Sequence, residues 1–216
     1  MNVSYKLIRT SSVRHPVQLV GPCESGSFVK AFLQFLYCAT SNLSQDIVDI
    51  TNTSQSVSTA ASAFISALHP GLDAGASQHY ANDGNGDTFA IQSLYADDVG
   101  VVVGTSSTAV AVADDNLVTQ VAHGSSAGQL VHYGSYGLNY TTGESSASFD
   151  LEREFRNDSG GSIVVAEIGV YAMSGLNSGA STTAKSFCLL RDVISPTVTV
   201  LDGEYLKVKY TITVSN

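Results

Sequence analysis

Tryptophan is absent from the sequence, and cysteine, basic residues and long apolar runs are scarce. The ten lysines and arginines are outnumbered by 19 acidic residues, which argues against nucleic acid as a partner because phosphate binding depends on clustered basic side chains. Cys23, Cys38 and Cys188 form no CxxC pair, so we interpret them as reduced thiols of a chain made in a cytoplasm. The lack of tryptophan weakens a sugar-binding role.

Membrane and secretion features are scarce as well. No run of about 18 apolar residues occurs, so no membrane span is expected. Residues 1–19 lack the apolar stretch and small-residue cleavage site of a secretory signal. With 44% hydrophobic and 13% charged residues, the chain has ample material for a buried core, and its net charge of -9 is interpreted as a solubility feature.

What is abundant favours antiparallel β-structure. Glycine, serine and threonine separate short runs of Val, Ile, Thr and Tyr at roughly ten-residue spacing, without repeating strand–helix units. We therefore predict a mainly β protein whose residues 71–216 form an antiparallel β-sandwich or jelly-roll-like domain. Residues 1–70 are predicted to be an extension that packs on this domain or on a neighbour.

One short amphipathic helix is predicted in this extension, within residues 27–42, and a buried strand is the alternative there. Lys30, Gln34 and Tyr37 would face outward from such a helix. The apolar positions that recur at helical spacing are Phe28, Ala31, Phe32, Phe35, Leu36 and Ala39.

Strict alternation marks the carboxyl-terminal third. Residues 147–155 alternate apolar and polar side chains, and so do residues 206–214, which predicts strands with one dry and one wet face. The turn residues 157–161 lead into the apolar run 163–172, and Asp202-Gly203 precedes the second alternating run. Both turns predict hairpins between the segments they join.

Arg153 and Glu167 fall on the apolar faces of the first of these two hairpins. If its turn is centred near Gly160, the two side chains lie nearly opposite each other on one face. Burying two opposite charges together costs less than burying each alone, so we predict a structural ion pair. The alternative, a catalytic carboxylate, lacks a second carboxylate or histidine that the sequence places beside it.

Two short motifs suggest chemistry. Residues 124–128, "GSSAG", match G-x-S-x-G with Ser126 as nucleophile, but that motif needs a strand before it and a helix after it. A loop between β segments is the better interpretation, and neither a catalytic residue nor a cofactor is predicted. Asp83, Asn85 and Asp87 alternate as calcium ligands do, although no bidentate glutamate follows at the required spacing. A solvated turn is favoured there over a metal site.

An aromatic-rich patch occurs at His132, Tyr133, Tyr136 and Tyr140. Loop tyrosines are enriched at protein interfaces and also stack on sugars. We favour a protein interface at this patch, and a contact with a glycan is the second interpretation.

Residues 108–135, 149–172 and 187–214 resemble proteins encoded among the virion genes of tailed bacteriophages. The resemblance covers roughly Gly100 to the carboxyl terminus, with a weaker match at residues 26–37. It consists of a pattern of strands and turns and identifies no site residue. It implies a virion structural protein of the tail, a fibre or the capsid surface.

The sequence therefore leads us to expect a non-enzymatic structural subunit of a bacteriophage particle, assembled in the host cytoplasm. Its expected partners are copies of itself and other virion proteins, which it would contact through the β domain and the amino-terminal segment. Tail or fibre is favoured over capsid decoration. The alternative is a receptor-binding module that recognises host-surface glycans through exposed loops, and a hydrolase ranks third.

Overall fold

The computed structural model describes residues 2–10, 16–25, 28–41, 43, 45–57, 96–178 and 181–215. The protein is mainly β, with antiparallel sheets and one short helix, which confirms the predicted fold class. The elements are β1 (Asn2–Thr10), β2 (Pro16–Ser25), α1 (Lys30–Ser41), β3 (Gln45–Val48), β4 (Ser54–Val57), β5 (Gly100–Gly104), β6 (Val131–Thr142), β7 (Ser146–Arg156), β8 (Ile163–Ser178), β9 (Ser181–Val200) and β10 (Tyr205–Ser215).

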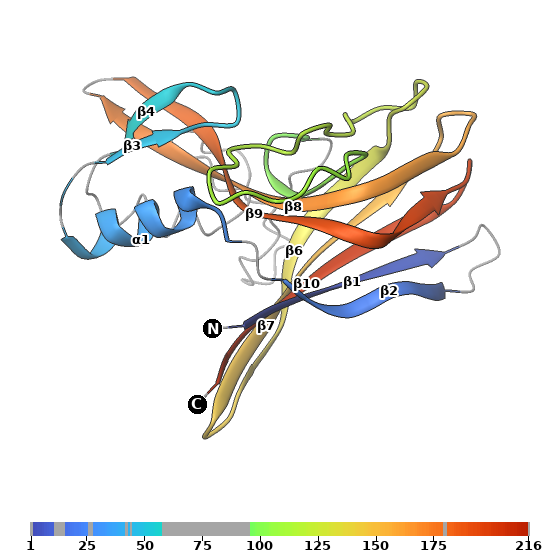
Figure 1. Cartoon of the computed structure of the whole chain (residues 1–216), viewed down its shortest axis with the longest axis horizontal. Coiled ribbons are helices and arrows are strands. Elements are labelled where there is room, and N and C mark those ends of the chain that lie inside the picture. Colours follow the sequence, from blue (N-terminus) through green and yellow to red (C-terminus); the bar gives the residue numbers. More distant parts are fainter. Residues whose placement is uncertain are drawn as a thin grey trace, which may run out of the picture.

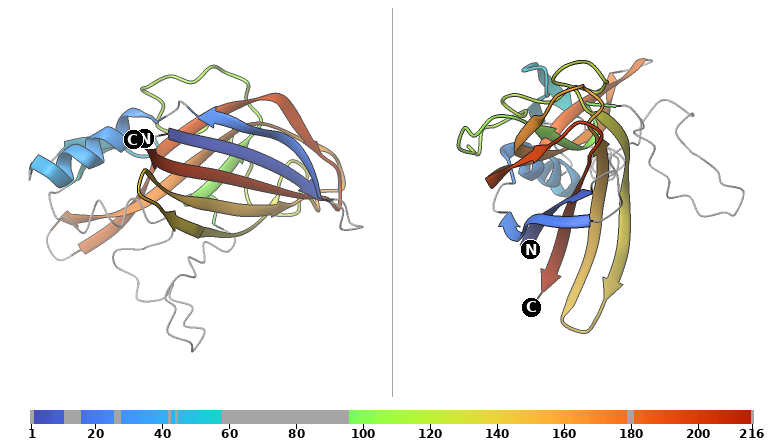
Figure 2. Two further views of the ribbon diagram at one scale, coloured as in Figure 1. Left: turned by 90° about the horizontal axis from the view of Figure 1, so that it is seen from below. Right: turned by 90° about the vertical axis from the view of Figure 1, so that its right-hand side faces the viewer.

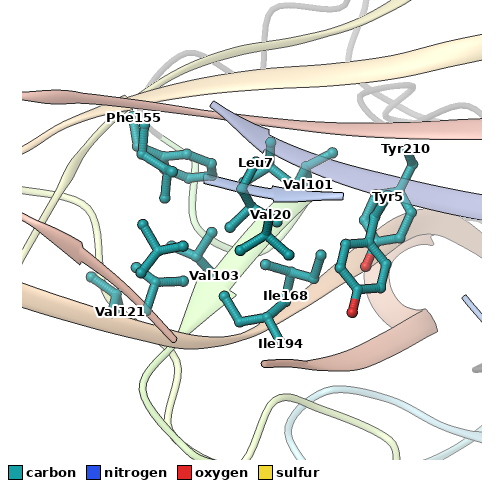
Figure 3. Packing of buried hydrophobic residues seen from close by; sticks show 14 of the residues in the cluster. Tyr5, Leu7, Val20, Val101, Val103, Val121, Phe155, Ile168, Ile194 and Tyr210 are labelled. Carbon is teal, nitrogen blue, oxygen red and sulfur yellow. The ribbon is translucent and has the colours of Figure 1, made fainter. Parts of the chain in front are cut away.

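Two sheets supply the sandwich-like core. The five-stranded sheet has the order β2-β1-β10-β7-β6, and the three-stranded sheet has the order β5-β8-β9 (Figures 1 and 2). Alternate side chains of both sheets meet in one buried cluster, to which β1 contributes Leu7, β10 contributes Tyr210, and β5 and β8 contribute Val101 and Ile168 (Figure 3). Period-two alternation is what allows each strand to give one face to this cluster.

The three-stranded sheet has buried side chains on both of its faces. While Val101 and Val103 belong to the main core, Val102 belongs to a second cluster on the opposite face. Helix α1 packs there, with the ring of Phe35 5.0 Å from that of Phe187 on β9 in an edge-on arrangement. The predicted helix is therefore confirmed, and it covers the sheet with the side that carries Phe35.

Strand pairing corrects the predicted boundary at residue 70. Strand β1 lies between β2 and β10, with Tyr5 opposite Tyr210 in the register. The side chains of Val3, Tyr5 and Leu7 are buried in the main core. Because these positions alternate as a strand requires, β1 and β2 are integral parts of the β domain. Within the described part of the predicted extension, α1 and the separate two-stranded sheet of β3 and β4 pack on that domain.

The two predicted carboxyl-terminal hairpins were wrong in their pairing. Strand β7 pairs with β6 and β10, whereas β8 pairs with β5 and β9. The turns at residues 157–162 and 201–204 therefore cross from one sheet to the other. The predicted dry and wet faces are confirmed for residues 151–155, where Leu151 and Phe155 are buried while Glu152 and Glu154 are only partly buried. They were wrong at the start of the strand, where Phe149 is exposed and Asp150 is buried.

One buried side chain joins the two crossing turns. The amide nitrogen of Asn157 donates to the carbonyl oxygens of Gly161 and Val200, both at 2.8 Å. Its main-chain oxygen accepts a hydrogen bond from Gly203 at 2.6 Å. The positive φ of Gly203, 77°, is one that glycine adopts without strain. Asn157 thus fixes how the chain passes between the sheets.

Within the described residues, α1 is the one helix, and it is too short to cross a membrane.

Candidate functional site

Arg153 lies in the interior, where it binds main-chain oxygens. Its Nε donates to the carbonyl of Tyr133 at 2.7 Å, and one terminal nitrogen donates to the carbonyls of Val99 and Val101 at 3.0 and 2.9 Å. Burial lowers the pKa of Arg153 to about 10, so the side chain stays charged at neutral pH. The guanidinium holds the segment that leads into β5 against β6.

Glu167 lies in the interior of the other sheet. Its carboxylate accepts a hydrogen bond from Arg191 Nε at 2.9 Å, and both side chains are fully buried. It also accepts hydrogen bonds from the main-chain amides of Val118 and Thr119, at 3.2 and 2.8 Å. A carboxylate with several such donors satisfies its hydrogen-bonding capacity without solvent.

The predicted pair of Arg153 with Glu167 was therefore wrong in its partner, although both charges are buried as expected. Strands β7 and β8 lie in different sheets, so the two residues are not cross-strand neighbours. Glu167 is opposite Val193 on β9 and thus diagonal to Arg191, a spacing that long side chains bridge.

Arg191 extends the ion pair to an irregular segment. One of its terminal nitrogens lies 2.7 Å from Asp114, and the other donates to the carbonyl of Thr108 at 2.8 Å. Burial alone would lower the pKa of Arg191, but the contacts with Asp114 and Glu167 outweigh it and raise that pKa. The chain from residue 105 to residue 119 is thereby fixed on the sheet although it forms no regular element.

Gly104 permits this close approach. A Cβ atom at this position would lie 2.6 Å from Oε1 of Glu167 and 2.6 Å from the carbonyl oxygen of Thr119. Real Cβ atoms do not come so close to other heavy atoms, so a glycine is required where β5 ends beside Glu167. The sequence signal was a glycine that closes the apolar run 99–103.

Sequence reasoning missed Arg191, Asn157 and Tyr205. The signal for Arg191 was a charged pair, Arg191-Asp192, inside the apolar run 187–194. Charged residues in such a run are rarely buried without a partner. For Asn157 and Tyr205 no pattern distinguishes them from ordinary turn and strand residues.

The predicted aromatic patch divides between interior and surface. His132 is fully buried beside Phe155, with ring centroids 5.0 Å apart, and is therefore not a surface contact. Its Nε2 has no hydrogen-bond partner among the residues that the structure describes. Burial, and then the nearby Arg153, lower the pKa of His132 to about 4. Tyr140 is 72% exposed near the end of β6, while the side chain of Tyr136 lies outside the described residues.

A second aromatic group lies on the outward face of the five-stranded sheet. The rings of Tyr133 and Tyr205 stack with centroids 6.4 Å apart, and the guanidinium of Arg156 lies 5.5 Å from the centroid of Tyr205. Arg156 also pairs with Asp158 at 3.0 Å. These side chains come from β6, β7, β10 and the turn after β7, so the fold brings together an aromatic and charged surface that only Tyr133 indicated in the sequence.

The other predicted sites have different outcomes. Asp83, Asn85 and Asp87 lie outside the described residues. Among the residues that the structure does describe, no group of three His, Cys, Asp or Glu side chains is placed to hold a metal. Ser126 is exposed on an irregular segment between β5 and β6, which confirms the loop interpretation of residues 124–128.

Helix α1 carries large apolar side chains on its exposed side. Leu33, Leu36 and Tyr37 are 61%, 40% and 46% exposed, and we call these three residues the outer helix face. Of these three residues, only Tyr37 was predicted to face outward, and Leu36 was predicted to face inward. The exposed Val112 lies near the start of the helix, since its carbonyl accepts a hydrogen bond from the amide of Lys30 at 2.8 Å. A helix that is apolar on both sides is typical of one buried on both sides.

Comparison with protein-family models, with curated proteins and with solved structures gave no match for this chain.

Proposed function

We propose that the chain is a non-enzymatic structural subunit of a bacteriophage particle, which assembles through its β domain and its amino-terminal segment. The observation that carries the proposal is the outer helix face. Exposed apolar patches on a soluble domain mark surfaces that partners cover, and on α1 three large apolar side chains share the exposed side.

The buried charges support the same proposal. Glu167 and Arg191 hold main-chain groups of the 105–119 segment, and Arg153 holds the segment before β5. These interactions make irregular segments into fixed surfaces, which favour docking because little ordering remains to be done on binding. Tail or fibre remains the favoured position, on the sequence resemblance alone.

The test is the composition of purified particles. Particles propagated from the genome that carries this sequence are separated on a density gradient and washed in high salt, and the chain is quantified by mass spectrometry. We expect a constant copy number per particle that survives the wash. Particles that are complete and infectious without the chain would contradict the proposal.

A second candidate is a module that binds host-surface glycans. Exposed Tyr140, together with the Tyr133 and Tyr205 stack beside Arg156, favours it, because aromatic rings flanked by polar side chains suit sugar stacking. Binding on a glycan array that is lost in Tyr140→Ala or Tyr205→Ala, and kept in the exposed control Thr142→Ala, would support this role. An array without any bound glycan would contradict it.

A further inference from the structure

We infer that the outer helix face is a contact between two copies of this chain, whose α1 helices pack antiparallel across a two-fold axis. The inference rests on the proposed function and specifies one surface and one partner for it. Figure 1 shows α1 at the side of the molecule, beside β3 and β4, and Leu33 on this helix is 61% exposed.

The positions on the helix suit such a contact. Lys30, Leu33 and Tyr37 are separated by three and four residues and therefore lie along one line of the helix, with Leu36 beside it. The midpoint between Leu33 and Tyr37 is residue 35. A two-fold axis at that point places Leu33 of each copy against Tyr37 of the other, and a helix of 12 residues is about 18 Å long.

Charge favours the antiparallel direction. Lys30 is the one charged residue of α1, and it lies in the first turn, where the helix dipole disfavours a cation. The last turn contains no basic residue that would complement its negative end. In an antiparallel pair, each Lys30 lies beside the carboxyl-terminal end of the other helix, where a cation is favoured.

Charge also favours a second copy through this face over other surfaces of the chain. The protein has a net charge of -9, so two copies repel each other in most orientations. The sequence of α1, KAFLQFLYCATS, contains no acidic residue. Contact through α1 therefore brings together a part of each copy that adds no negative charge.

Sedimentation equilibrium tests the surface. We expect the wild-type chain to form dimers, and the variant Leu33→Ser/Tyr37→Ser to associate about tenfold or more weakly. The matched control, Leu201→Ser/Val214→Ser, removes two half-exposed apolar side chains far from α1 in the sequence and should associate as the wild type does. Circular dichroism checks that all three proteins are folded.

Cross-linking with a short bismaleimide tests the direction. In a Cys23→Ser background, where Cys38 and Cys188 are buried, Leu36→Cys should cross-link to itself, because the two copies of this position are about 3 Å apart along the axis. Lys30→Cys should not, because its two copies are separated by about 15 Å along the axis. Lys30→Glu should weaken association and raise the melting temperature of the monomer.

Equal association of the wild type and the Leu33→Ser/Tyr37→Ser variant would overturn the inference, and so would cross-linking of Lys30→Cys as efficient as that of Leu36→Cys. The particle test separates these failures from a failure of the proposed function. A chain that is present in particles but associates independently of α1 contradicts only the helix contact. A chain that is absent from particles contradicts the proposed function itself.

Discussion

At the scale of single residues, Glu167 has the largest expected effect on stability. Its carboxylate accepts hydrogen bonds from Arg191, Val118 and Thr119. Glu167→Ala leaves the buried guanidinium with Asp114 as its remaining carboxylate and deprives two amides of their acceptor. We expect the free energy of unfolding to fall by about 3–5 kcal/mol, as measured by urea denaturation.

Glu152 provides the matched control. It lies on the outward face of β7, 3.5 Å from Lys207 and 3.8 Å from Lys209, and water reaches all three side chains. Exposed ion pairs contribute little, so Glu152→Ala should cost less than about 1 kcal/mol. Equal decreases in the free energy of unfolding for the two variants would show that the interactions of Glu167 do not stabilise the protein.

His132 predicts a dependence of stability on pH. Its pKa falls from 6.5 to about 4 on folding, through burial and then Arg153, so the unfolded chain takes up its proton first. The contribution of His132 to the free energy of unfolding is therefore complete above pH 6.5. It is lost as the pH falls toward 4, which lowers the free energy of unfolding by roughly 3 kcal/mol at most. Urea denaturation across this range measures the loss.

His132→Phe should flatten this part of the profile, because it removes the titrating group. His123 and Asp97 also face the ring and influence its pKa. Burial raises the pKa of Asp150, but hydrogen bonds from neighbours outweigh it and leave that pKa lowered, so further stability is lost in stronger acid. The quantity to compare is therefore the difference in free energy of unfolding between wild type and variant at each pH. If this difference stays constant between pH 4 and 6.5, His132 does not cause the loss of stability.

At the scale of elements, Asn157 determines how the strands connect. Its side chain binds the carbonyls of Gly161 and Val200 and accepts from Ser159. Asn157→Ala removes both donated hydrogen bonds, of which the one to the carbonyl of Val200 is buried, and should cost about 3 kcal/mol. Asn157→Asp should be at least as costly at neutral pH, because a carboxylate oxygen replaces the donor that faces two carbonyls.

Thermal unfolding at pH 7 compares the two Asn157 variants. The order of melting temperatures should be wild type first, then Asn157→Ala, then Asn157→Asp. An aspartate variant that is as stable as the wild type would show that the donated hydrogen bonds do not hold the two turns together.

Local patterns predicted the strands and the helix but not their partners. The alternation along residues 147–155 indicates that one face of the strand is buried. It does not indicate which strand lies beside it, because a strand in a hairpin and a strand in a sandwich both bury one face. Asp202-Gly203 indicates a turn, yet a turn between sheets and a turn within one sheet use the same residues. Pairing is decided by contacts between distant segments, such as β1 with β10.

At the candidate site too, the sequence predicted local properties but not the partners of each residue. The apolar surroundings of Arg153 and Glu167 were sufficient to predict that both charges are buried, because the prediction depends on neighbours in the sequence. Their partners depend on strand order, and Arg191 is 24 residues from Glu167. The exposed side of α1 was missed because helical spacing identifies an apolar stripe but does not show what covers it.

At the scale of the whole molecule, the sandwich-like core and the outer helix face have different roles. Strands of the two sheets together form one buried hydrophobic cluster, which is the main core of the protein. Leu33 and its neighbours on α1 remain exposed on the surface of the protein. A protein with this division is expected to fold as a single chain and to bury the remaining apolar surface by association.

Molar mass in solution tests this claim most directly. Light scattering coupled to size-exclusion chromatography would measure the mass of the purified chain at several concentrations. We predict a discrete oligomer of at least two copies whose population grows with concentration. The mass of a single chain at every concentration would contradict the claim.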